Sequence, residues 1–126
     1  MFERPVYIAS YLRTDQNDNG ADIDIYDTPQ RYLINFQPVS DYLAYQEYGQ
    51  DVSSVKRALV RREIFYGKVK QRDKVYLNDE NNPFENLCEV VESETERCLK
   101  ANYEVIKAVL QGYYIRIDIR KIKKRG

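Results

Sequence analysis

The most informative part of the chain runs from Tyr103 to Ile122 and reads YEVIKAVLQGYYIRIDIRKI. It holds two strand-like runs around a Gln-Gly pair, which is typical of a β-hairpin. In the second run Ile115, Ile117 and Ile119 alternate with charged residues. Because successive side chains of a strand point to opposite faces, one face of this strand is apolar and the other is charged. The sequence therefore predicts an antiparallel sheet that packs on a core through one face and shows its charges to water or to a partner.

Other parts of the chain also favour strands. Alternating or β-branched patterns predict them over residues 6–13, 21–26, 31–36 and 74–77. Residues 53–66 fit either a helix or a strand, and the alternation of Ala58, Val60 and Ile64 favours the strand. A chain of this length suits one domain, so we predict a single all-β domain over residues 1–126.

Two polar connections join the first predicted strands. Residues 14–20 end in an Asn-Gly pair, which predicts the tip of an N-terminal hairpin. Residues 39–51 carry Tyr42, Tyr45 and Tyr48 at a spacing of three, which places the three rings on one side of a short helix. Gly49 would end that helix. A tyrosine row of this kind is most often part of a core or an interface.

A third connection, residues 78–100, breaks the strand pattern altogether. Asn81-Asn82-Pro83 stops a strand, and the apolar residues that follow are dispersed among acids, which predicts an inserted loop with one or two helical turns. Long structureless connections are uncommon in compact domains unless they are functional or disordered. The insertion is therefore a candidate working surface, and a plain surface loop is the alternative.

Composition speaks against catalysis. The chain has no His, which removes the commonest general base and the commonest neutral metal ligand. Its five glycines are scattered, so they do not form a phosphate-binding loop. The N-terminus lacks the apolar region of a secretory signal, and Cys88 and Cys98 are therefore expected to be reduced thiols of a protein made in the cytoplasm. We predict no enzyme activity, metal, cofactor or membrane segment.

Charge is balanced in number but separated along the chain, with 20 basic and 20 acidic residues. The acidic candidates for an interface or a channel lining belong to the insertion and are Glu85, Glu89, Glu92, Glu94 and Glu96. The basic candidates are Lys56, Arg57, Arg61 and Arg62, together with Lys123, Lys124 and Arg125 of the short tail 121–126. A solvated face explains each block taken alone. Separate patches of opposite sign also let copies of one chain pair head to tail and close into a ring.

The order of these elements resembles the small head-tail connector proteins of tailed bacteriophages, of the stopper or head-closure type. The likeness covers most of the chain. Its best local matches are RDKVYL at residues 72–77, ANYEV at residues 101–105 and the hairpin tip between Asp15 and Tyr26.

The resemblance implies a small SH3-like β-barrel with long inserted loops, which works as a ring of identical copies in the neck of the virion. Such a ring joins the portal or adaptor ring to the tail proteins and helps to retain the double-stranded DNA that passes through it. The resemblance implies no reaction. It assigns the loops, here 14–20, 39–51 and 78–100, to contacts with neighbours or to closing the channel. We expect the acidic insertion to face the channel or the neighbouring subunit, because acids lining a conduit repel phosphate.

Two alternatives stay open at this point. A tail-completion or tail-side joining protein would be structurally close to a stopper. A small-barrel nucleic-acid-binding protein would use the basic block 56–74, the basic C-terminus and exposed tyrosines. The neutral net charge argues against the second alternative.

Overall fold

The computed structural model describes residues 4–39, 42–78, 84 and 100–122 of the chain. Strands hold 53% of these residues and helices hold 19%. The predicted all-β class with little helix is therefore confirmed. Of the insertion predicted at about 78–100, residues 79–83 and 85–99 lie outside the described part of the chain.

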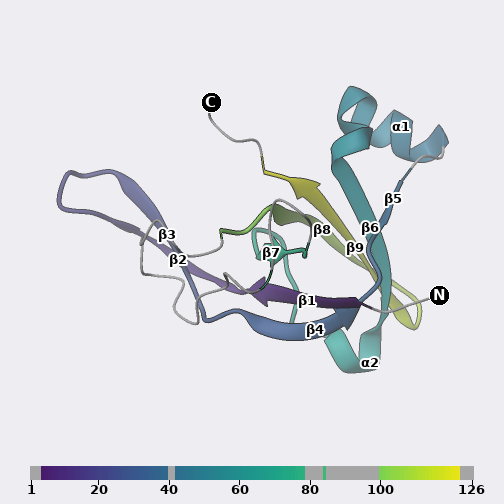
Figure 1. Ribbon diagram of the computed structural model, residues 1–126, viewed down its shortest axis with the longest axis horizontal. Coiled ribbons are helices and arrows are strands. Elements are labelled where there is room, and N and C mark those ends of the chain that lie inside the picture. Colours follow the sequence, from purple (N-terminus) through teal and green to yellow (C-terminus); the bar gives the residue numbers. More distant parts are fainter. Residues whose placement is uncertain (1–3, 40–41, 79–83, 85–99, 123–126) are drawn as a thin grey trace.

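Seven strands form one antiparallel sheet in the order β4-β1-β7-β8-β9-β6-β5 (Figure 1). Their bounds are Arg4–Ala9 (β1), Gln30–Ile34 (β4), Gln37–Pro38 (β5), Val55–Arg61 (β6), Lys74–Tyr76 (β7), Tyr103–Gln111 (β8) and Tyr114–Lys121 (β9). Strands β2 (Tyr11–Gln16) and β3 (Asp22–Tyr26) pair only with each other. The helices are α1 (Tyr42–Tyr48), the 3₁₀ helix η1 (Gly49–Ser54) and α2 (Arg62–Phe65).

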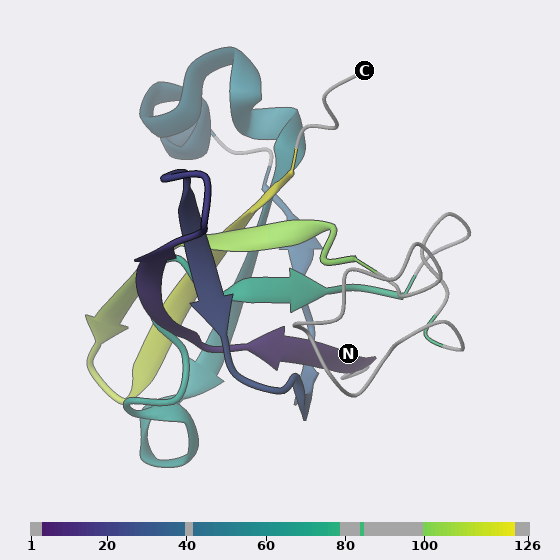
Figure 2. The same ribbon diagram turned by 90° about the vertical axis from the view of Figure 1, so that its left-hand side faces the viewer.

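The large sheet curls because its two edges follow each other in the chain. Strand β4 is one edge and β5 is the other, and only Asn35 and Phe36 separate them. Consecutive Cα atoms are 3.8 Å apart, so the three steps from Ile34 to Gln37 span at most about 11 Å. The edges are held near each other and the sheet becomes a half-barrel, seen in Figure 2 from the side on which β2 and β3 project.

The concave side of the half-barrel holds the apolar core. The isoleucines that alternate in the opening stretch lie here, and Ile117 and Ile119 have no exposed surface at all. The other members of the core are Val6, Ile8, Ile34, Ala58, Val60, Phe65, Val69, Val75, Tyr103, Val105 and Ile115. The predicted apolar face of the last strand is therefore confirmed.

The C-terminal hairpin pairs as the sequence predicts, with β8 against β9. The structure adds β6 on the other side of β9. The turn of the hairpin lies one residue further on than the Gln-Gly pair, because Gln111 is still paired with Tyr114. Gly112 takes a φ of 61° there, a left-handed conformation that suits glycine.

The structure corrects two of the predicted strands. The run 6–13 is divided at Ser10, where β1 ends inside the barrel and β2 leaves it. The strand predicted within 53–66 ends at Arg61, and α2 follows. As a result Ile64 is exposed, and Phe65 enters the core in its place. Propensity favoured a continued strand, but burial of the larger ring decides the local structure.

The short helix expected within 39–51 is confirmed as α1, which ends before Gly49. Gly49 has a φ of 59°, as expected of a glycine that terminates a helix. Among the described residues, no helix is both long and apolar enough to cross a membrane.

Candidate functional site

The β2–β3 hairpin projects from the barrel as an arm, defined here as residues 11–27 (Figure 1). All residues from Leu12 to Gln16 and from Asp18 to Asp24 are exposed, including the apolar Leu12 and Ile23. The arm is strongly acidic, since it has one base, Arg13, and the five exposed acids Asp15, Asp18, Asp22, Asp24 and Asp27. An isolated two-stranded hairpin is marginally stable in water. The arm therefore needs support from its root or from a partner.

The tip of the arm is built around Asn17. Its side-chain Oδ1 accepts hydrogen bonds from the backbone N–H groups of Asn19 and Ala21, at 2.9 and 3.0 Å. Gly20 closes the turn with a φ of 80°. These bonds satisfy the turn locally and leave the carboxylate of Asp18 facing solvent. Within the described part of the chain, Asp18 makes no ion pair.

Asp73 fixes the root of the arm. Its carboxylate is completely buried and accepts backbone hydrogen bonds from Tyr11 at 2.9 Å and from Lys70 at 3.0 Å. Burial raises the pKa of Asp73 because the charged form loses its water, and the two backbone N–H bonds oppose that rise. The backbone of the same residue bonds to β8, since its C=O accepts the N–H of Val105 at 2.8 Å. The turn that precedes β7 thus positions the arm relative to the barrel.

Aromatic rings complete the root. Tyr11 and Tyr26 meet edge to face with ring centroids 5.7 Å apart. The guanidinium of Arg72 lies 4.2 Å from the centre of the Tyr11 ring and pairs with Asp24 at 3.5 Å. Burial, followed by the nearby charge of Asp24, raises the pKa of Tyr26 to about 12. The root is thus held by a buried carboxylate, two rings and a cation, while the tip has none of these supports.

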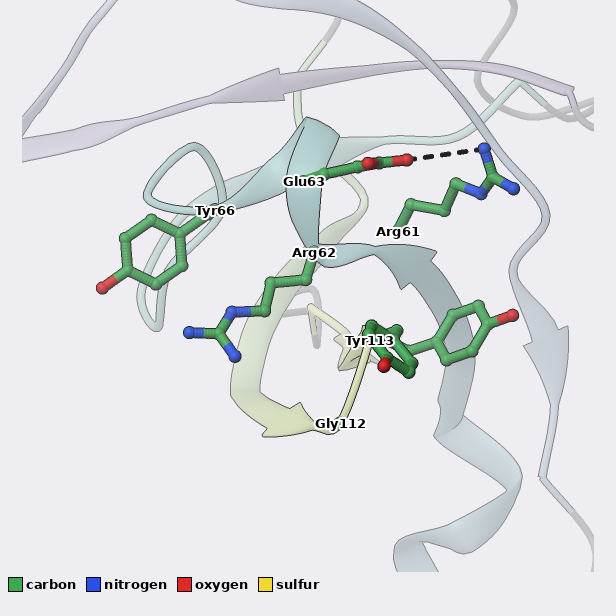
Figure 3. A pocket seen from close by; sticks show the side chains of 7 residues that line it. Arg61, Arg62, Glu63, Tyr66, Gly112 and Tyr113 are labelled. Atoms are coloured by element: carbon green, nitrogen blue, oxygen red, sulfur yellow. Dashed lines mark ion pairs between the residues drawn. The ribbon is translucent and has the colours of Figure 1, made fainter.

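A groove of about 820 Å³ lies at the other end of the molecule, where α2 meets the β8–β9 turn. Its lining combines three tyrosines with two arginines and one acid, and consists of Arg61, Arg62, Glu63, Tyr66, Gly112, Tyr113 and Tyr114 (Figure 3). The three rings are exposed, and Tyr113 is 89% exposed. Exposed rings beside cations are typical of binding surfaces.

One backbone hydrogen bond joins the two walls of the groove. The backbone N–H of Arg62 donates to the C=O of Tyr113 at 2.9 Å, which ties the start of α2 to the hairpin turn. The Arg62 guanidinium lies 5.6 Å from the centre of the Tyr66 ring. Tyr66 directly follows α2, and its side chain extends in the same direction as that of Arg62 (Figure 3). Arg61 pairs with Glu63 at 3.5 Å, but both side chains are more than two-thirds exposed, so this pair is weak.

A second polar cluster lies under α1, on the convex face of the sheet. Asp118 of β9 is completely buried there, although the alternating pattern predicted a charge facing water or a partner. Arg57 Nε donates to it at 2.7 Å, and the hydroxyl of Tyr48 donates at 2.5 Å. Burial by itself raises the pKa of Asp118, but the bonds from Arg57 and Tyr48 outweigh that effect and lower it. This cluster docks α1 onto the sheet.

Glu47 extends the same cluster. Its carboxylate pairs with Lys107, with Arg116 at 3.5 Å and with Arg57 at 3.6 Å. Arg57 and Lys107 are the register neighbours of Asp118 on the two flanking strands. The charged side chains on this part of the convex face therefore pair with one another.

The predicted interface residues are thus divided among several places. Tyr42 and Tyr45 are exposed on α1, whereas Tyr48 points into the Asp118 cluster. Arg61 and Arg62 line the groove, Arg57 belongs to the Asp118 cluster, and Lys56 lies 5.6 Å from the centre of the Tyr103 ring. The remaining predicted residues, Glu85, Glu89, Glu92, Glu94, Glu96, Lys123, Lys124 and Arg125, lie outside the described part of the chain.

The sequence predicted the N-terminal hairpin and its loop 14–20, but it did not predict that this hairpin projects as an acidic arm, nor the tyrosines of the groove. The arm had a signal, because Asp22 and Asp24 alternate with isoleucines and three further aspartates lie nearby in sequence. The groove had none, since Tyr66 and Tyr113 are distant in sequence and come together only where α2 meets the hairpin turn. Among the described residues, no three His, Cys, Asp or Glu side chains cluster as metal ligands would.

In comparisons with known proteins, no family model, no curated protein and no solved structure matches the chain.

Proposed function

We propose that the chain is a structural protein of a bacteriophage neck, of the stopper or head-completion type. It works as a ring of identical copies between the portal or adaptor ring and the tail proteins, and it helps to retain the packaged DNA. It catalyses no reaction and binds no cofactor. The local resemblance of residues 72–77 and 101–105 to proteins of this type supports the role.

The observation that carries the proposal is the projecting arm. A barrel with a buried core has no structural use for an exposed acidic hairpin that contacts it only at the root. A buried carboxylate nevertheless holds that root in place. A subunit that must reach a neighbour in a ring has a use for such an arm, since heterologous contacts join two different surfaces of the same chain. The exposed Tyr42 and Tyr45 of α1 offer a further contact surface.

One observation favours nucleic-acid binding as a second candidate. The groove places Arg62 beside exposed rings, and bases stack on such rings when cations hold the phosphates. Two features weigh against it. Arg57 of the basic block is committed to Asp118, and Glu63 stands in the groove itself. A tail-completion role is the third candidate and differs in position within the particle.

The test is to follow this protein through particle assembly. An epitope-tagged copy should appear in purified virions at the neck in negative-stain images with gold-labelled antibody. Loss of the gene should give DNA-filled or leaking heads without tails. Label on the tail side, with heads that keep their DNA when the gene is lost, would favour tail completion. Absence of the protein from virions would refute both roles.

A further inference from the structure

We propose that the tip of the arm of one copy docks into the groove formed by α2 and the β8–β9 turn of a second copy. The inference deepens the proposed self-assembly and rests on it for its biological setting. It concerns only residues that the structure describes. The acidic insertion, which the sequence favoured for subunit contacts, has no part in it.

Position is the first argument. The arm projects at one end of the longest axis of the molecule, and α2 and the β8–β9 turn lie toward the other end (Figure 1). A copy placed along this axis brings its arm to its neighbour's groove and leaves its own groove free for the next copy. Contacts between two different surfaces repeat in this way, and they close into a ring when the rotation between copies allows it.

Charge is the second argument. At the tip, Asp18 and Asp22 are exposed and make no ion pair within the described part of the chain. In the groove, the guanidinium of Arg62 stacks on a ring but has no carboxylate partner among the described residues. Arg61 pairs with the exposed Glu63 at 3.5 Å, and a carboxylate of the arm can replace Glu63 in this weak pair. Opposite potentials on the two surfaces select this orientation of the copies and exclude like-on-like contacts.

Apolar contact and size are the third argument. Ile23 is paired with Asp15 close to the tip, and it is 39% exposed. It offers an aliphatic side chain to Tyr66, Tyr113 and Tyr114 of the groove. A cavity of this size suits a drug-sized ligand or a few residues of a peptide. The tip of a hairpin fits such a volume, whereas a folded domain does not.

The first experiment reverses the charges in the full chain. Asp18→Lys with Asp22→Lys, or Arg61→Glu with Arg62→Glu, should weaken self-association about tenfold or more, because attraction becomes repulsion. The chain with all four substitutions should associate again, since the reversed surfaces match each other. The measurement is sedimentation velocity at low salt over a concentration series, with circular dichroism to verify that each variant is folded.

Matched controls carry the same change of charge elsewhere. Asp27→Lys with Asp51→Lys alters the root of the arm and η1, away from the tip. The second control is Lys100→Glu with Lys121→Glu, at the end of the β8–β9 hairpin that lies opposite the turn. Both pairs are exposed and should leave self-association within about twofold of the wild-type chain. If the controls weaken association as much as the tip and groove variants, net charge and not docking is responsible, and the proposal is wrong.

The second experiment asks for proximity. In a background with Cys88→Ser and Cys98→Ser, one chain carries Asn19→Cys at the tip and another carries Tyr113→Cys in the groove. A short bismaleimide should cross-link the mixture to a heterodimer at higher yield than either chain alone, and 1 M NaCl should reduce that yield. Equal yields in the mixture and in the separate chains would overturn the docking.

The outcomes separate this inference from the neck role. A chain that associates normally despite reversal of the tip or the groove contradicts the arm contact and leaves the neck role standing. Rescue in the fourfold variant, with the protein absent from virions, supports the contact and refutes the neck role. Binding of a single-stranded oligonucleotide that is lost on Arg61→Glu with Arg62→Glu, together with unaltered self-association, would assign the groove to nucleic acid instead.

Discussion

The buried carboxylate of Asp73 accepts the backbone N–H of Tyr11 at 2.9 Å, across 62 positions of sequence. Tyr11 is the first residue of the arm, and Asp73 directly precedes β7 of the barrel. A short turn therefore fixes the direction in which a projecting hairpin leaves the domain. Because the carboxylate is completely buried, this bond is shielded from competing water.

Removing that carboxylate should loosen the arm without unfolding the barrel. Asp73→Ala leaves the N–H groups of Tyr11 and Lys70 without their acceptor, and it also removes the cost of burying a charge. The net effect should be a loss of about 2 kcal/mol in the free energy of unfolding. Hydrogen exchange measured by mass spectrometry should lose protection in β2 and β3 and keep it in β8 and β9.

Asp24→Ala is the matched control, because this exposed carboxylate also sits near the root and pairs with Arg72. Exposed pairs contribute little, so its loss should cost less than about 1 kcal/mol and leave exchange in the arm nearly unchanged. Equal effects of the two substitutions would show that the buried acceptor has no special part in fixing the arm.

Tyr48→Phe should detach α1 from the sheet in part. The change removes a hydroxyl that donates to the buried carboxylate of Asp118, and hydrogen bonds to charged groups contribute about 1.5 kcal/mol or more. Urea unfolding should show that loss. Tyr45→Phe removes the same hydroxyl from an exposed ring of the same helix and should cost less than about 0.5 kcal/mol. A cost for Tyr45→Phe as large as that for Tyr48→Phe would contradict the docking role.

Asp118 should make the domain sensitive to acid. Its pKa in the folded protein lies below the ordinary value of 3.8, so its stabilisation is complete above that value and is lost as pH falls through the folded pKa. Asp118→Asn should lower stability by about 3 kcal/mol at pH 7, since it leaves Arg57 half-buried beside a neutral partner. The penalty should shrink as pH falls below about 4.

The measurement is the difference in unfolding free energy between wild type and Asp118→Asn, followed from roughly pH 2 to pH 7. The raised pKa of Asp73 acts in the opposite direction, because its ionised form is disfavoured in the fold, and this contribution is common to both chains. A difference that stays constant with pH would show that Asp118 is not ionised in the folded protein.

Ile117→Asp should prevent folding. Ile117 has no exposed surface and lies in the centre of the sheet between β6 and β8, so the substitution buries an unpaired carboxylate at a cost of several kcal/mol. Leu59→Asp is the control on neighbouring β6, where the side chain is 59% exposed on the opposite face of the sheet. It should melt within a few degrees of the wild type. A soluble Ile117→Asp chain with unchanged melting would contradict the assigned core face.

The all-β class, the C-terminal hairpin and the inward face of its second strand follow from the amino-acid pattern alone. Alternation is a local property, and Ile115, Ile117 and Ile119 carry it without help from distant residues. The short helix that ends before Gly49 is local as well, because its length and its end depend on neighbouring residues.

The other features depend on contacts between distant parts of the chain. Asp118 alternates like a surface charge, yet α1 covers it, because Tyr48 and Arg57 arrive from other parts of the chain. Ile64 and Phe65 exchange roles because the core takes the larger ring. The arm leaves the barrel at Tyr11 because a carboxylate 62 positions away accepts its N–H. Contacts between residues distant in sequence leave no periodic pattern, so alternation along the chain predicts the strands but neither the groove nor the buried Asp118 cluster.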